Sequence, residues 1–310
     1  MRRNLSNWAL ASVIAASASS VVYADQEVDT ATMPFPVLDR STPKTMGQIP
    51  YLAPLSDRKP DWPPLFKKPN VSSPSVTSRN KAPSDISSMD ALPEPPKIAV
   101  VIDDVGYNRR GMEESLALPL PVVLAILPET PYGARTAQRA HLQERITILH
   151  APMENERELK LGPGGLYVNM DEQTFKQTLN ADLDSTPYVT GVNNHMGSLL
   201  TTHPEHMGWV MDIMAERSLF FIDSLTSPQS VAHATAVERG IRTVTRDIFL
   251  DNVRSEVAID KQFERLLKRA HKQGSAIAIG HPYPETTRYL KRRLNQPLSA
   301  QLVTIDTLLK

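Results

Sequence analysis

Short apolar runs recur along the last two thirds of the chain. Each is four to six residues long, and most are rich in Val, Ile, Leu or Ala without the polar–apolar alternation of a half-exposed strand. Such runs predict strands buried on both faces, as in a parallel sheet. The runs cover Ile98–Ile102, Val122–Leu127, Ile146–Leu149, Tyr188–Val192, Leu219–Ile222, Thr243–Ile248 and Ala276–Ile279.

Helical patterns lie between most of these runs. They span Arg110–Leu118, Ala134–Gln143, Asp171–Leu183, Pro204–Arg217, Ser227–Arg239 and Ile259–Gln273. Repeated strand–helix units predict an α/β fold with a parallel sheet, and about seven of them favour a closed or nearly closed barrel. An open doubly wound sheet is the alternative. No glycine-rich phosphate loop follows any run, which disfavours a nucleotide-binding version.

The first 24 residues have the pattern of a secretory signal peptide. A basic head, Met1–Arg3, precedes an apolar body, Trp8–Ala24, and Val22–Ala24 is a small-residue cleavage site. An uncleaved anchor is the alternative, but serines interrupt the segment. No other stretch is long and apolar enough to span a bilayer. We therefore expect an exported protein, in the periplasm of a Gram-negative bacterium, with no membrane span after signal removal.

Residues 25–96 and 97–310 differ in composition. The first segment carries a proline every few residues and no sustained apolar period, which predicts a disordered proline-rich tether; a docking strip is the alternative. The second is long enough for one large domain. The chain has zero formal net charge and no cysteine. These features argue against a nucleic-acid partner and an anionic membrane surface, and they exclude disulfides and thiolate chemistry.

Carboxylates and imidazoles follow nearly every predicted strand. The strand-end segments are Asp103-Asp104, His150-Ala-Pro-Met-Glu154, Asn193-Asn194-His195-Met-Gly-Ser198, Asp223-Ser224, Arg246-Asp247, Asp251-Asn252 and Gly280-His281-Pro282. The carboxyl ends of parallel strands meet at one edge of a sheet, where α/β proteins hold ligands and metals. So many polar residues at one edge are hard to explain by packing. They predict a polar catalytic rim.

Mixed Asp and His ligands suit a hydrolytic divalent ion, most simply Zn²⁺, with an open coordination position. Such an ion lowers the pKa of bound water, while a nearby carboxylate acts as base and a histidine as acid. Ser198 and Ser224 are alternative nucleophiles. No Gly-x-Ser-x-Gly elbow surrounds either serine, so a serine hydrolase is the weaker hypothesis.

The strand-end motifs together resemble those of the divergent polysaccharide deacetylases, relatives of the NodB-like carbohydrate esterases. The motifs are Ile-Asp-Asp, His-x-Pro-Met-Glu, Asn-Asn-His-Met-Gly-Ser, Phe-Ile-Asp-Ser and Gly-His-Pro. The resemblance covers about Lys97 to Lys310. It implies a distorted (β/α) barrel and a metal-dependent removal of N- or O-linked acetyl groups from a polysaccharide.

The resemblance also implies roles for single residues. It makes Asp103 the general base, Asp104 and His150 metal ligands, and His281 the general acid. The usual His-x-x-x-His pair reads His150-x-x-x-Glu154 here. Either Glu154 is the third ligand, or His195 completes an Asp-His-His set, which we favour because imidazole suits zinc.

Further site candidates follow from the same resemblance. The usual Arg-Pro-Pro-Tyr oxyanion motif is absent, which leaves Asn193, Asn194 and backbone amides near Gly197 as donors. Ser198 and Asp223 are additional candidates. Two functions remain open: a metal-dependent deacetylase of an acetylated envelope polysaccharide, or a weak or silent relative that keeps a glycan- or metal-binding pocket.

Overall fold

The computed structural model describes residues 94–310. The predicted signal peptide and nearly all of the predicted tether lie outside this range. Within residues 94–310, no helix is both long enough and apolar enough to cross a membrane.

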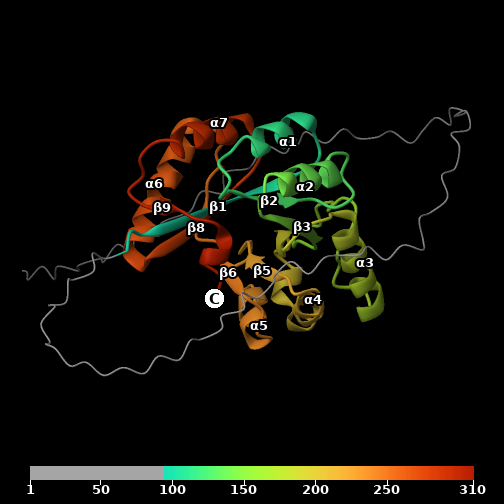
Figure 1. The fold of residues 1–310 in the computed structure, drawn as a ribbon. Coiled ribbons are helices and arrows are strands. Elements are labelled where there is room, and N and C mark those ends of the chain that lie inside the picture. The colour runs from blue at the N-terminus through green and yellow to red at the C-terminus, as the bar shows by residue number, and fades with distance from the viewer. Residues whose placement is uncertain (1–93) are drawn as a thin grey trace, which may run out of the picture. The chain divides into compact units, whose positions relative to one another are not determined.

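Nine strands form one curled sheet, and every pairing between them is parallel (Figure 1). The neighbour order is β6-β5-β4-β3-β2-β1-β8-β7, and β9 pairs with the beginning of β1. The strands are β1 (Lys97–Val105), β2 (Val123–Ile126), β3 (Thr147–Met153), β4 (Gly191–Met196), β5 (Phe220–Asp223), β6 (Thr243–Thr245), β7 (Ile248–Phe249), β8 (Ser275–Gly280) and β9 (Gln301–Leu302). This arrangement confirms the predicted parallel α/β sheet in the form of a distorted barrel.

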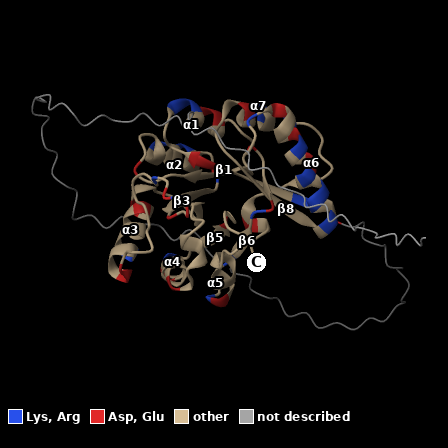
Figure 2. Cartoon of the chain, turned by 180° about the vertical axis from the view of Figure 1, so that it is seen from behind, with Lys and Arg blue, Asp and Glu red and all other residues tan. Residues whose placement is uncertain are grey.

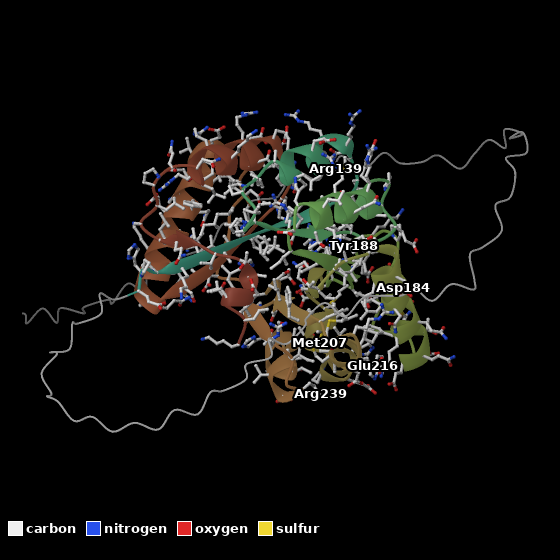
Figure 3. The ribbon with its side chains drawn as sticks, in the orientation of Figure 1. Arg139, Asp184, Tyr188, Met207, Glu216 and Arg239 are labelled. Carbon is white, nitrogen blue, oxygen red and sulfur yellow. The ribbon has the colours of Figure 1, made fainter. Side chains whose placement is uncertain are left out.

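The helices cover the outside of the sheet, from α6 and α7 past α1 and α2 to α3, α4 and α5 (Figure 1). Charged residues are spread along these helices (Figure 2). Met207 of α4 is fully buried, whereas Glu216 near the end of the same helix is exposed (Figure 3). The helices are α1 (Arg109–Leu116), α2 (Gly133–Leu142), α3 (Glu172–Ser185), α4 (Pro204–Arg217), α5 (Ala232–Glu238), α6 (Glu256–Gln273) and α7 (Pro284–Arg293), with short 3₁₀ turns η2 (Leu200–Thr202) and η3 (Ile305–Thr307).

Burial on both faces explains the continuous apolar runs. Along β1, Ile98 and Val100 belong to a cluster that also holds residues of α1, α6 and α7, whereas Ala99 and Val101 belong to the cluster inside the barrel. Alternate residues of one strand therefore face two different apolar layers. The chain's last residues, including Ile305, join the interior cluster.

The barrel has a seam between β6 and β7. The predicted single strand Thr243–Ile248 is wrong in this respect, because Arg246 and Asp247 divide it. The amide of Arg246 still donates to Asp223 at the end of β5, but the amide of Asp247 donates to Ile277 of β8. The backbone thus changes partner strand within two residues, which brings the two ends of the sheet together.

Other element boundaries also differ from the sequence pattern. The predicted strand Tyr188–Val192 lies further along, at Gly191–Met196, because Tyr188 adopts a left-handed backbone with φ of +67°. The predicted helix Ser227–Arg239 begins only at Ala232. Its expected first turn is instead a loop held by Asp223, whose Oδ2 accepts from Ser230 Oγ at 2.9 Å.

Candidate metal centre

Asp103 and Asp104 reach the same rim through a bulge in β1. Side chains of successive strand residues normally point to opposite faces of a sheet. Between two successive pairings with β2, the chain moves three residues along β1, from Ile102 to Val105, but only two along β2, so β1 holds one extra residue. Asp104 in this segment has a left-handed backbone with φ of +57°. Aspartate tolerates this conformation better than most residues. The bulge therefore lets both carboxylates approach His150.

Three ligand atoms converge from β1, β3 and β4, where Asp104 and His195 lie near the strand ends and His150 lies in the middle of its strand. Oδ1 of Asp104 lies 3.2 Å from Nε2 of His150 and 2.9 Å from Nδ1 of His195, and these two ring nitrogens are 3.1 Å apart. His195 lies opposite Pro152 in the β3–β4 register, just beyond His150 on the neighbouring strand. Among residues 94–310 these three side chains form the one group of potential metal ligands.

The donor set fits a divalent ion. Oδ1 of Asp104 is buried and has no hydrogen-bond partner, although two imidazole nitrogens lie against it. Burial opposes ionisation of Asp104, but the imidazoles, His195 first, outweigh it and hold the pKa of this carboxyl well below its usual range. One carboxylate oxygen and two imidazole nitrogens, with coordination positions left over, is a combination found in zinc hydrolases.

Asp103 is buried beside this group and belongs to a hydrogen-bonded chain. Its Oδ1 accepts from Nδ2 of Asn193 at 2.9 Å, and its Oδ2 lies 3.7 Å from Nε2 of His150. Oδ1 of Asn193 lies 2.8 Å from Nδ1 of His150. Burial raises the pKa of the Asp103 carboxyl, although the neighbouring histidines oppose the shift. Asp103 is thus a carboxyl with increased proton affinity.

His281 completes the rim from the end of β8. Its Nε2 lies 3.9 Å from Oδ2 of Asp104, and its Nδ1 lies 2.8 Å from Oδ1 of the buried Asp251. Burial opposes the charged imidazole, but the bond to Asp251 and the nearby aspartates outweigh it and raise the pKa of His281 to about 9. The rings of Phe249 and Tyr283 stack with the imidazole at centroid distances of 6.1 and 5.4 Å. The ring is therefore held with Nε2 toward Asp104.

Glu154 and Ser198 do not join the ligand group. Oε2 of Glu154 accepts from the amide of Val168 at 2.7 Å, and the backbone of Glu154 binds Leu166 in the same connection between β3 and α3. Oγ of Ser198 accepts from the amide of Glu156 at 3.1 Å. Both residues therefore hold loops together. Of the two sequence alternatives for the third ligand, the structure brings His195, not Glu154, to Asp104 and His150.

The remaining candidates organise the loop after β5. Asn194 donates to the carbonyl of Met196 at 2.7 Å and accepts from the amide of Ser224 at 2.9 Å. Asp223 accepts from the amide of Leu225 at 2.8 Å and from Ser230. These bonds give Asn194 and Asp223 protein partners. The NH₂ groups of Asn193 and Asn194 are likewise bonded to the protein, so neither amide is free to serve as the expected oxyanion donor.

The sequence showed Asp251 at a strand end but gave it no role. The structure places it as the partner of His281: Oδ2 also accepts from the amide of His281 and from Oγ1 of Thr286, each at 2.7 Å. The signal that could have revealed Asp251 is its position directly after the buried Leu250. This segment follows β7, which pairs with β8, the strand that leads to His281. Sequence spacing did not reveal that neighbour relation, because 30 residues separate the two.

Known proteins are similar to this chain over about the length that the structure describes. An uncharacterized protein of Haemophilus influenzae is 38% identical over 213 residues, covering 68% of this chain and 76% of that protein. The uncharacterized protein YibQ of Escherichia coli K12 is 34% identical over 214 residues, 69% of this chain and 67% of that protein. The crystal structure of an uncharacterized protein from Agrobacterium tumefaciens C58 superposes with a TM-score of 0.66 at 21% identity, covering 70% of this chain and 91% of that one.

The sequence model of one family matches nearly all of the residues that the structure describes. It describes the divergent polysaccharide deacetylases and covers residues 100–309, from the middle of β1 to the end of the chain. The match includes every strand-end residue discussed above and confirms the resemblance drawn from the motifs. The chain belongs to the divergent polysaccharide deacetylase family.

Proposed function

We propose that the domain is a metal-dependent hydrolase that removes N- or O-linked acetyl groups from a cell-envelope polysaccharide. The observation that carries the proposal is the convergence of Asp104, His150 and His195, with Asp103 and His281 beside them. A site that only bound a metal would have no use for a carboxyl of raised proton affinity and an oriented imidazole next to the ligands. The binding-module hypothesis lacks an observation of this kind.

Asp104, His150 and His195 would hold the ion, and Zn²⁺ suits this set of one carboxylate and two imidazoles. Bound there, the ion supplies Lewis-acid polarisation of the acetyl carbonyl and a more acidic water. The protein's part is to keep the three donor atoms together, which the bulge in β1 and the register of β3 with β4 do.

Asp103 and His281 would move the protons. The buried Asp103 carboxyl, with its raised pKa, accepts a proton from the attacking water. The Nδ1–H group of His281 donates a hydrogen bond to Asp251 and stays protonated. The proton on Nε2 is therefore the one that His281 gives to the leaving amine or alkoxide. The cleaved bond is the acyl C–N or C–O bond, and acetate is the second product.

The cellular setting is also a proposal. The predicted signal peptide, 1–24, would export the chain to the periplasm. The tether, 25–96, would position the domain within the cell envelope. Cell fractionation with an antibody to the mature protein tests the location. A cytoplasmic protein with its first residues intact would contradict it.

Metal analysis and acetate release test the function together. The mature protein is purified, its metal content is measured, and acetate release is assayed on N- and O-acetylated envelope glycans. We expect one bound divalent ion per chain, and release by the wild type that falls at least about 100-fold in Asp103→Asn, since general base catalysis contributes on this order. A bound metal without acetate release from any of these glycans would contradict the enzyme.

A further inference from the structure

Asn193 bonds to the proposed base and to a proposed ligand at the same time. We infer that Asn193 is a positioning residue: it presents Nε2 of His150 without a proton to the metal centre while it holds the carboxylate of Asp103. The inference rests on the metal centre of the proposed function. It adds the residue that sets the tautomer of one ligand, His150. Nothing in the strand-end motifs distinguished Asn193 from Asn194 in this respect.

The orientation of the Asn193 amide follows from its neighbours. Nδ2 lies 2.9 Å from Oδ1 of Asp103 and 3.2 Å from Oγ of Ser224, while Oδ1 lies 2.8 Å from Nδ1 of His150. An ionised carboxylate only accepts hydrogen bonds. The reversed amide would set its oxygen against the Asp103 carboxylate, so Asp103 fixes the amide with its oxygen toward His150.

This orientation decides which nitrogen of His150 carries the proton. An amide oxygen accepts hydrogen bonds and cannot donate, so Nδ1 of His150 must be the donor. A neutral imidazole carries one N–H, which leaves Nε2 with a free lone pair. Nε2 is the nitrogen that lies 3.2 Å from Oδ1 of Asp104 and 3.1 Å from Nδ1 of His195. The lone pair therefore lies on the nitrogen that joins the ligand group.

The place of Asn193 in the sheet makes the contact rigid. Asn193 pairs directly with His150 in the parallel register of β3 and β4, so the two side chains stand next to each other. The Asn193 side chain is fully buried, and water does not compete for its bonds. An amide also has no charge to gain or lose. Asn193 can thus hold the Nδ1–H tautomer of the neutral His150 ring.

Two substitutions separate the acceptor role from simple packing. Asn193→Asp keeps an oxygen for Nδ1 of His150, and a proton shared with Asp103 replaces the lost amide hydrogen bond. Asn193→Leu is similar in size but has no acceptor. The assigned two-bond ¹H–¹⁵N correlation of His150 is recorded for the metal-free full-length chain above the pH at which the ring loses its proton. We expect the Nδ1–H tautomer in the wild type and in Asn193→Asp, and loss of this preference in Asn193→Leu.

Zinc binding without any glycan gives the second measurement. Calorimetric titration with Zn²⁺ alone should show affinity falling about 10–100-fold in Asn193→Leu, as for other residues that orient a ligand, and staying within a few-fold of the wild type in Asn193→Asp. An Nε2–H tautomer in the wild type overturns the inference. So does an equal loss of zinc affinity in both variants, because a packing role predicts that the buried carboxylate is tolerated no better than leucine.

These results are independent of turnover. If Asn193→Leu does not fold, as judged by thermal unfolding, the wild-type tautomer and the zinc affinity of Asn193→Asp still decide the question. A protein that binds zinc through the Nδ1–H form of His150 but releases no acetate would support the role of Asn193 while contradicting the proposed enzyme. An active enzyme with the Nε2–H form would do the reverse.

Discussion

Single side chains decide what chemistry the strand ends can perform. His195 brings its Nδ1 to the ligand group, whereas Glu154, at the spacing where the related esterases carry a histidine, bonds to the backbone of its own loop. The two histidines of the candidate ligand group therefore lie on two neighbouring strands, β3 and β4.

The buried carboxyl of Asp182 in α3 leads to a prediction about the pH dependence of stability that does not involve the metal centre. It is about 1% exposed, its Oδ2 has no hydrogen-bond partner, and a Cβ on Gly164 would meet its carboxyl. Burial, with the charge of Glu129, raises the pKa of Asp182 to about 8. The folded chain thus holds a proton that the unfolded chain has released. The free energy of unfolding should fall as pH rises from about 4 to about 8, by up to about 1.4 kcal/mol per unit from this group.

Urea unfolding at several pH values checks this prediction against two variants. In Asp182→Asn that contribution disappears, so the variant should gain stability relative to the wild type as pH rises from 5 to 8. Asp184→Asn, an exposed position on the same helix, serves as the control and should follow the wild type (Figure 3). A stability difference between Asp182→Asn and the wild type that is constant with pH would be inconsistent with a raised pKa.

The strand-end positions of the site residues could be predicted from the sequence, but their contacts could not. Asp103, Asp104, His150, His195 and His281 each follow a buried run, and parallel topology brings such positions to one edge. Side-chain direction depends on local backbone geometry, such as the left-handed φ of Asp104, and no sequence pattern reported it. For the same reason the motifs alone suggest Asn193 as one of several possible oxyanion donors, whereas its amide is bonded to Asp103 and Ser224.

Elements are tied together by a buried guanidinium outside the site. Arg145, just before β3, donates to the carbonyls of Leu118, Pro119 and Val122 at 2.7, 2.9 and 2.8 Å, in the connection from α1 to β2. Burial lowers the pKa of Arg145 to about 10, which keeps it charged at neutral pH. Arg145→Met would remove the guanidinium from all three carbonyls and leave that of Pro119 with the amide of Val122, so we expect the free energy of unfolding to fall by about 3 kcal/mol or more.

Chemical denaturation of matched variants checks this expectation. Arg145→Lys should recover only part of the loss, because an ammonium lacks the planar fork of the guanidinium. Arg139→Met removes a partly exposed arginine paired with Glu113 and should cost less than about 1 kcal/mol (Figure 3). Equal losses for Arg145→Met and Arg139→Met would mean that the buried carbonyls do not depend on Arg145.

For the helices and strands, periodicity predicted six helices and seven strand regions. The structure differs from this prediction at a few elements, each for a local reason. The sixth run divides at Arg246 and Asp247 because its two halves pair with different strands. Helix α7 was missed because its sequence is mostly polar and its few buried residues, such as Tyr289 and Leu290, give a weak apolar pattern. Strand β9 has only two residues, and pairing with β1 defines it.

On the scale of the whole molecule, Asp247 holds the barrel seam. Its Oδ2 accepts from the amide of Ile277 at 2.9 Å, and its Oδ1 accepts from Arg269 and Gln273 of α6, whose outer face carries many Lys and Arg residues (Figure 2). The carboxylate thus supplies bonds that a neighbouring strand would otherwise make. We expect Asp247→Ala to lower the free energy of unfolding by about 1–3 kcal/mol and to speed hydrogen exchange of the Ile277 amide.

Amide hydrogen exchange by NMR resolves this effect along the sheet. Protection should fall first at Ile277 and its neighbours in β7 and β8, and remain near that of the wild type in β3 and β4 on the other side of the barrel. Glu216→Ala, at an exposed position on α4, is the control and should leave the exchange of Ile277 unchanged. A uniform loss of protection over all strands would show that the seam does not open separately.

Acetate release as a function of added zinc tests whether Asp104, His150 and His195 hold a catalytic metal ion. The mature protein is stripped with a chelator and assayed on an acetylated envelope glycan while Zn²⁺ is added back. We expect no release without metal and a recovery that saturates at about one ion per chain. Zinc should restore release in Glu154→Gln but not in His195→Ala. Release that survives chelation, or that requires Glu154 and not His195, would contradict an Asp104–His150–His195 metal centre.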